Sequence, residues 1–129
     1  MVLNGFIAVG VGAAIGAWLR WGMGLMLNAA LPTLPLGTLL ANLVGGYLMG
    51  LAIGYFEYGE GLTPEQRLLI TTGFLGGLTT FSTFSAEAMA LLTRGDYGWA
   101  SLHVISHVVG SLVMTGLGLL TIQWLRAGH

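Results

Sequence analysis

Four long apolar segments, each long enough to cross a lipid bilayer, make up most of the chain. They cover roughly residues 3–27, 37–56, 68–92 and 99–125. A membrane-spanning helix needs about 20 mostly apolar residues, and the connections between these segments are too short to hold a further domain. We therefore predict an all-α membrane protein in which residues 1–129 form a single domain of four transmembrane helices.

The third segment should not be one continuous helix. Gly76 and Gly77 lie near its centre, and a glycine costs about 1 kcal/mol relative to alanine in a helix interior. Hydroxyl side chains follow closely, at Thr79, Thr80, Ser82 and Thr83. We predict a break near Gly76–Thr80, with helix resuming at Phe81. Non-helical backbone is tolerated at membrane depth only where it is buried in protein or lines a wet cavity, so an ion or substrate site is expected here.

Two polar residues in the first half of the chain have two possible roles each. Arg20 either reaches toward the membrane surface or caps carbonyl groups of a broken helix and draws anions toward a vestibule. Asn42 continues a stripe of glycines spaced by four, Gly46, Gly50 and Gly54, which predicts a closely packed helix face. The Asn42 amide either joins two helices or donates hydrogen bonds to a bare anion.

Polar residues in the second half of the chain point to a path or a partner. Glu87 is the one acid deep within a predicted span, which makes it a functional candidate. The fourth segment carries polar residues spaced by four, at His103, His107, Ser111 and Thr115. We expect this stripe to face a wet path or a partner. The two histidines have metal-ligand spacing on a helix, but a zinc site is the less favoured interpretation because Glu87 is the only intramembrane acid to join them.

Composition supports the membrane class and excludes others. The chain is 55% hydrophobic and 7% charged, whereas a soluble domain is about 25% charged. A net charge of −1 argues against nucleic-acid binding, and the absence of cysteine excludes disulfides and thiolate metal sites. The first segment has no basic residues before it, so we expect a retained helix and not a signal peptide. There is no Gly-x-Ser-x-Gly or His-Glu-x-x-His motif, and we predict no enzyme activity.

The arginines give no bias that would orient the chain in a membrane. With four spans, Arg67 and Arg126 lie on one side, and Arg94 lies on the other, joined by Arg20 if its side chain reaches the membrane surface. An excess of basic residues on one side normally fixes the orientation. We therefore predict that the chain inserts both ways up and assembles as an antiparallel, dual-topology homodimer in the lipid bilayer.

The run Gly76–Ser85, GGLTTFSTFS, resembles the signature of the Fluc (CrcB) family of fluoride channels. The runs Gly16–Trp21 (GAWLRW) and Gly37–Gly45 (GTLLANLVG) support the resemblance, which extends over essentially the whole chain. It implies antiparallel homodimers in the cell (plasma or inner) membrane, with two pores that pass fluoride, exclude chloride and lower cytoplasmic fluoride.

The resemblance also implies roles for individual residues. It places Asn42, Phe81 and Phe84 in the pore, with a polar track drawn from Thr80, Ser82 and Thr83. Thr38 and Ser111 are assigned to the pore as well, and Arg20 and Glu87 to a vestibule. A structural sodium ion at the dimer interface is implied, held by the backbone carbonyls of Gly76 and Thr79 from both subunits.

The leading interpretation is a passive fluoride-selective channel. Donor groups and the positive edges of phenylalanine rings can replace the water around a small anion, and the absence of Lys and Arg from mid-pore suits rapid release. The alternative is a small dual-topology transporter coupled to protons or sodium, in which Glu87 acts with His103 or His107. A purely structural subunit is less favoured, because the intramembrane acid and the polar stripe would serve no purpose.

Overall fold

The computed structural model describes residues 2–59 and 61–128, and every regular element in them is helical. Three long rods are the helices α1 (Val2–Leu27), α2 (Leu36–Glu57) and α6 (Tyr97–Ala127). A fourth rod is interrupted. It consists of α3 (Pro64–Leu68), the π-helical stretch η1 (Leu69–Leu75), α4 (Gly76–Leu78) and α5 (Phe81–Thr93).

All four rods are long and apolar enough to cross a membrane. The prediction of four apolar helices is therefore confirmed. The third rod begins at Pro64, earlier than the predicted 68. Thr63 causes this early start, because its hydroxyl accepts from the Gln66 amide at 3.1 Å while the Gln66 side chain accepts from the Thr63 amide at 2.9 Å.

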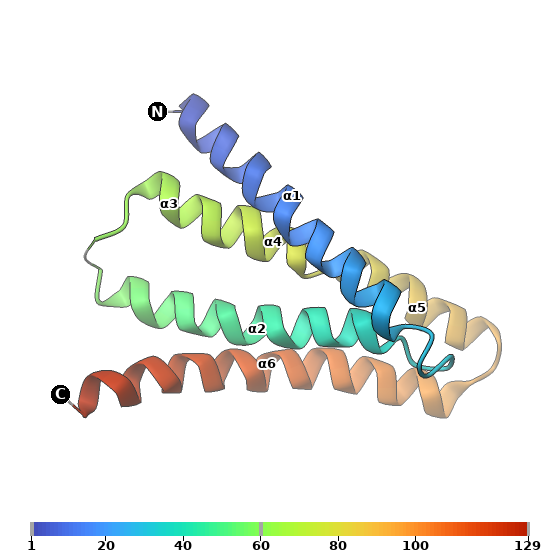
Figure 1. The fold of residues 1–129 in the computed structure, drawn as a ribbon. Helices are drawn as coiled ribbons and strands as arrows, with labels where there is room; N and C mark the ends of the chain where they lie inside the picture. The colour runs from blue at the N-terminus through green and yellow to red at the C-terminus, as the bar shows by residue number, and fades with distance from the viewer. Residues whose placement is uncertain (1, 60, 129) are drawn as a thin grey trace.

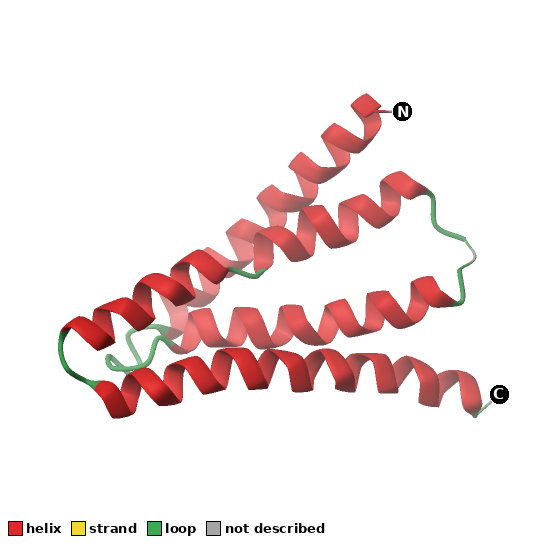
Figure 2. Ribbon diagram, turned by 180° about the vertical axis from the view of Figure 1, so that it is seen from behind, coloured by secondary structure: helices red, strands yellow, loops and turns green. Residues whose placement is uncertain are grey.

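The rods form an elongated bundle (Figure 1). Helices α2 and α6 lie side by side along their lengths in both views, and α1 crosses the others at an angle so that its N-terminus splays away (Figures 1 and 2). Both termini lie at the same end of the bundle as the connection between α2 and α3. The other two connections lie at the opposite end, as expected for a chain that crosses four times.

Glycines allow α2 and α6 to pack backbone against backbone. A Cβ atom on Gly50 would overlap the Thr115 carbonyl oxygen, and one on Gly118 would overlap that of Tyr47. At Gly46 a Cβ would lie 3.0 Å from the Ser111 carbonyl oxygen. The predicted close-packed stripe of α2 is therefore confirmed, and α6 is its partner.

Glycines also bring α1 against the third rod. A Cβ on Gly16 would overlap the Phe74 carbonyl oxygen, and one on Gly77 would overlap that of Ala13. These contacts explain a difference from the predicted break. Gly76 and Gly77 are helical, because Gly77 serves close packing against α1 and does not end the helix.

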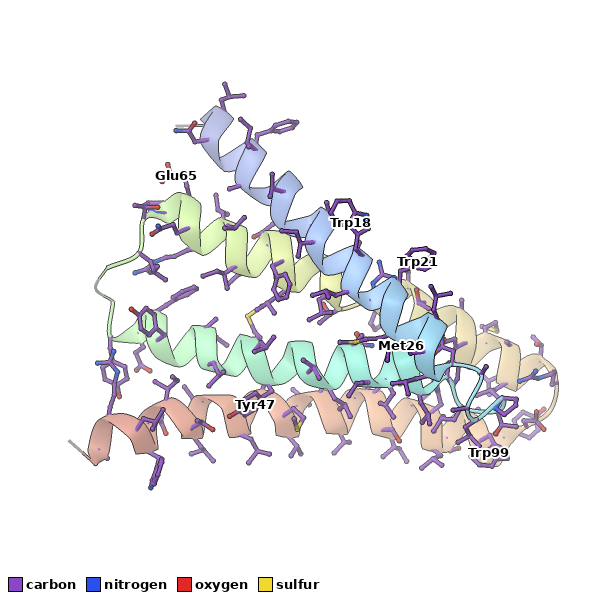
Figure 3. The ribbon with its side chains drawn as sticks, viewed as in Figure 1. Trp18, Trp21, Met26, Tyr47, Glu65 and Trp99 are labelled. Atoms are coloured by element: carbon purple, nitrogen blue, oxygen red, sulfur yellow. The ribbon has the colours of Figure 1, made fainter. Side chains whose placement is uncertain are left out.

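The outer face of α1 is apolar and carries bulky aromatic residues. Trp18 and Trp21 are 67% and 66% exposed and point away from the bundle (Figure 3). Exposed large apolar side chains occur on every long rod. A surface of this kind suits lipid contact, and the chain is a multi-pass membrane protein.

Candidate functional site

The third rod is interrupted at two threonines. Thr79 has φ −90° and ψ 154°, and Thr80 has φ −148° and ψ 121°, so both are extended. The Thr80 hydroxyl accepts from the Thr83 amide at 3.2 Å and caps α5. The Thr79 hydroxyl donates to the Leu75 carbonyl at 2.9 Å. The bend in the third helix is thus confirmed, and its non-helical part is narrower than Gly76–Thr80.

Asn42 of α2 holds the extended backbone in place. Its Oδ1 accepts from the Thr80 amide at 2.8 Å, and its Nδ2 donates to the Thr80 carbonyl at 3.1 Å. Nδ2 also lies 2.9 Å from Nδ1 of His107 on α6. The Asn42 amide therefore joins three rods, and both of its N–H groups have acceptors within the chain.

The two phenylalanines of the motif meet in an edge-to-face pair. The ring centroids of Phe81 and Phe84 are 5.5 Å apart, with 64° between the ring planes. Phe84 is 8% exposed and packs against the His107 ring at 4.7 Å, whereas Phe81 is 78% exposed. Phe84 is therefore packed inside the bundle, whereas Phe81 lies on the surface of the chain.

Both phenylalanines line a cleft of about 500 Å³ beside the break. Its polar lining residues are Asn42, Thr71, Thr79, Thr80, His107, Ser111 and Thr115. Gly76 lines it as well, and no Lys, Arg, Asp or Glu does so among the described residues. The cleft is an uncharged chamber with hydrogen-bonding groups on otherwise apolar walls.

A second cleft of about 290 Å³ lies on the other side of Thr80. Arg20, Thr38 and Thr83 contribute to its lining, and Thr80 lines both clefts. Ser82 lies beside this point, with its hydroxyl 3.4 Å from that of Thr80. The extended threonine is therefore the boundary between a chamber with a cationic wall and a chamber with none.

Arg20 contacts the broken rod directly. Its Nε donates to the Gly77 carbonyl at 3.0 Å, across 57 residues of sequence. Of the two roles considered for Arg20, this contact matches the capping of carbonyls near a helix end. Its role in a vestibule remains a prediction.

Glu87 joins residues from three rods. Its Oε2 accepts from the Thr38 hydroxyl at 2.8 Å, and its Oε1 lies 3.7 Å from Nε2 of His103. His103 is fully buried, and its Nε2 lies 3.2 Å from the Phe84 carbonyl. Thr38, which was assigned to the pore, and Glu87, which was assigned to a vestibule, are thus joined by a hydrogen bond.

Two partners at this site could not be assigned from sequence. The sequence marks His107 as a member of the polar stripe, a candidate metal ligand and a possible partner of Glu87, but it does not predict the bond to Asn42. Asn28 was not singled out, yet its Oδ1 accepts from the amides of Gly37 and Thr38 at 2.8 and 3.2 Å and so caps α2. The spacing of His103 and His107 by four is the sequence feature that identifies His107. Asn28 lies in a connection, nine residues before Gly37, and no sequence pattern identifies it.

Four apolar rods around a polar break define a multi-pass membrane protein with two small clefts that meet at one residue. Comparison with known proteins identifies the family to which the chain belongs. The family model described as "CrcB-like protein, Camphor Resistance (CrcB)" matches residues 7–119. The chain belongs to this CrcB-like family.

Curated relatives match over nearly the full length. "Fluoride-specific ion channel FluC" of Cupriavidus pinatubonensis is 65% identical over 121 residues, which is 94% of this chain and 96% of the relative. Proteins of the same description from Nitrosospira multiformis and Pseudomonas paraeruginosa are 61% and 60% identical over 97% and 92% of this chain, and 98% and 94% of the relatives. These relatives are channels and not enzymes, in agreement with the prediction from the motifs.

Proposed function

We propose that this chain is a passive fluoride channel that lets fluoride leave the cell and so lowers its cytoplasmic concentration. The observation that carries the proposal is the uncharged cleft beside the Asn42–Thr80 clamp, in a chain whose relatives are described as fluoride-specific channels. Fluoride is small and strongly hydrated, so a path for it must offer donors and ring edges in place of water.

The proposed path runs through both clefts and past Thr80. Fluoride enters beside Arg20, Thr38 and Thr83, which line the smaller cleft. It then passes the Thr80 and Ser82 hydroxyls and reaches the larger cleft, lined by Phe81, Phe84 and Ser111. Because no cationic side chain lines the larger cleft in the described residues, binding there stays weak enough for the ion to leave.

Asn42 can serve this path only by exchanging a partner. Both of its N–H groups have acceptors, the Thr80 carbonyl and Nδ1 of His107. The backbone bond secures the break, so the bond to His107 is the one that an anion would replace. Asn42 would then hold the break and bind fluoride with different hydrogen atoms of the same amide.

The proposed working unit is an antiparallel homodimer of single four-helix domains. Phe81 supports this, because it is 78% exposed in one chain although it lines the cleft. A second copy would cover it and close the path. The arginines give little bias toward one orientation: Arg67 and Arg126 lie near Phe56 and Tyr58 at one end, and Arg94 pairs with Asp96 at the other. Arg20 is bound to the Gly77 carbonyl, so the two ends differ by one arginine. A two-fold axis in the membrane plane would then make the ends alike.

A structural sodium ion at the dimer axis fits the carbonyls that the break releases. In an uninterrupted helix the Thr80 and Thr83 amides would donate to the carbonyls of Gly76 and Thr79. Here they donate to Oδ1 of Asn42 and Oγ1 of Thr80 instead. The two carbonyls therefore lack their helical donors, and a hard cation prefers oxygen ligands. Four such oxygens, two from each subunit, would hold the ion.

The channel is tested by fluoride release from liposomes that contain the purified protein. A passive channel needs only a path for compensating charge, so release should begin when a potassium ionophore is added and should not need a pH gradient. The competing function is a proton-coupled carrier, favoured by the 3.7 Å approach of Glu87 to His103. A carrier would move fluoride only with protons, and release would follow an imposed pH gradient without the ionophore.

A further inference from the structure

Glu87, His103 and His107 form a cluster that the proposed fluoride path does not use in full. One ligating atom from each residue lies within 4.8 Å of the other two. His103 and His107 are 0% and 3% exposed. Each residue also keeps one buried polar atom without a hydrogen-bond partner: Oε1 of Glu87, Nδ1 of His103 and Nε2 of His107. A buried polar atom left unpaired is costly, so a group that satisfies all three at once would be stabilised here.

Neighbouring hydrogen bonds already orient two of these residues as metal ligands. A carbonyl can only accept, so the contact between Nε2 of His103 and the Phe84 carbonyl puts the ring proton on Nε2. The lone pair of Nδ1 is then free. Glu87 is held in the same way, because Oε2 accepts from Thr38 and leaves Oε1 free. Second partners of this kind fix the tautomer and direction of ligands in metal sites.

The third residue couples the cluster to the fluoride path. Nδ1 of His107 accepts from Nδ2 of Asn42, because the contacts of Asn42 with Thr80 fix which amide atom donates. In that tautomer the ring proton sits on Nε2. Coordination of a metal through Nε2 would move the proton to Nδ1, which could then no longer accept from Asn42.

We propose that Glu87, His103 and His107 form an inhibitory site for a divalent transition-metal cation such as Zn²⁺. Two imidazoles and one carboxylate, with a fourth position open, are a ligand set that zinc uses, and imidazole selects Zn²⁺, Ni²⁺ and Cu²⁺ over Mg²⁺ and Ca²⁺. Zinc–ligand bonds of about 2.1 Å require ligand atoms roughly 3.4 Å apart. One ligand atom from each of the three residues lies within 4.8 Å of the others, so the side chains need to close by only about 1.4 Å to reach this spacing.

The bound metal should slow fluoride passage in two ways. It turns Nδ1 of His107 from an acceptor into a donor that faces the N–H group of Asn42. The two donors repel each other, which displaces the Asn42 amide that holds the break and that would bind fluoride. The metal also places two positive charges beside Phe84, where a fluoride ion would bind too tightly to leave quickly. The binding site stands on the cluster geometry alone, whereas the inhibition rests on the proposed channel function.

Binding is measured on the purified, tag-free full chain by titration with Zn²⁺, followed by calorimetry. We expect saturation at one Zn²⁺ per chain and no binding of Mg²⁺. His103→Gln and Glu87→Gln should each weaken binding by roughly tenfold or more. The matched control Glu57→Gln changes the same residue type outside the cluster and should bind as the unmodified chain does. No saturable Zn²⁺ binding, or equal affinity in all three variants, overturns the proposal.

Two further measurements keep the test independent of variant folding and of the channel function. X-ray absorption of the zinc-loaded unmodified chain should show two imidazole ligands, and an all-oxygen shell would overturn the site. In liposomes, Zn²⁺ at saturating concentration should slow fluoride release at least tenfold. Binding with unchanged release would retain the metal site and overturn its inhibitory role. Absence of release even without Zn²⁺ would reject the channel and leave the binding result standing.

Discussion

Asn42 pairs with both backbone polar groups of Thr80. Oδ1 accepts from the Thr80 amide at 2.8 Å and Nδ2 donates to the Thr80 carbonyl at 3.1 Å. One side chain of α2 thereby satisfies both backbone hydrogen-bonding groups of a non-helical residue. Unpaired backbone groups within a bilayer cost several kcal/mol, so this pair is what permits an extended residue at the boundary between the two clefts.

Replacing Asn42 should disable the chain through this pair. Asn42→Ala leaves both Thr80 groups and Nδ1 of His107 unpaired, at about 1–3 kcal/mol for each buried group. We expect fluoride release from liposomes to fall at least tenfold and the melting temperature to drop. Asn4→Ala, at an exposed position of α1, is the control and should change neither. Release at the unmodified rate from Asn42→Ala would contradict the role of the clamp.

Replacing either phenylalanine should reduce fluoride release, but only the replacement of Phe84 should also destabilise the folded chain. Phe81→Ile and Phe84→Ile each remove a ring edge from the cleft, and we expect each to reduce fluoride release at least tenfold. Phe84 is buried against His107, so Phe84→Ile should also lower the melting temperature. Phe81 is exposed in a single chain, so Phe81→Ile should leave the melting temperature of the separated chain unchanged.

Phe6→Ile provides the control for both changes. Phe6 is 77% exposed on α1, close to the exposure of Phe81, and lies outside the cleft. It should release fluoride normally. Normal release by both Phe81→Ile and Phe84→Ile would remove ring edges from the account of fluoride passage.

Gly77 should be required for packing and not for the break. A Cβ there would meet the Ala13 backbone, with Cα 2.9 Å away, and backbone atoms cannot yield as a flexible side chain can. We expect Gly77→Ala to lower the melting temperature and the yield of folded protein, at a cost of about 1–3 kcal/mol. Gly22→Ala, where no atom lies within 4 Å, should fold as the unmodified chain does. Equal stability of the two variants would show that α1 does not pack there so closely.

The same residue shows where prediction from sequence stops. Apolar length alone predicted four helices, and the run of hydroxyl residues marked the break. The prediction that the glycines cause the break is wrong, because Gly77 is required for close packing against Ala13 of α1. The helix ends at Thr79, and a side chain of α2, Asn42, pairs with the extended backbone of Thr80. Both contacts join different rods, and the spacing of residues within one segment does not predict how the rods pack against each other.

The candidate site was predictable in its members but not in its connections. Asn42, Glu87 and the phenylalanines stand out because polar or paired aromatic residues within apolar segments are unusual. The bond between Asn42 and His107, and the approach of Glu87 to His103, depend on the register of α6 against α2 and α5. No pattern within a single helix specifies that register.

The proposed antiparallel dimer predicts that uniform orientation abolishes function. Glu57→Lys with Glu65→Lys adds positive charge at one end of the bundle, and Asp96→Lys with Tyr97→Lys adds it at the other; basic residues favour the cytoplasmic side. Each double variant alone should insert one way and release no fluoride. Co-expression of the two should restore release. Full activity of one variant, shown by labelling to be uniformly oriented, would contradict the dimer.

The central claim is that this chain conducts fluoride in preference to chloride. The most direct measurement is efflux from liposomes loaded with equal fluoride and chloride, started with a potassium ionophore and followed with an electrode for each anion. The account predicts rapid fluoride release while chloride stays inside. Retention of both anions by assembled protein, or release of both at similar rates, would contradict it.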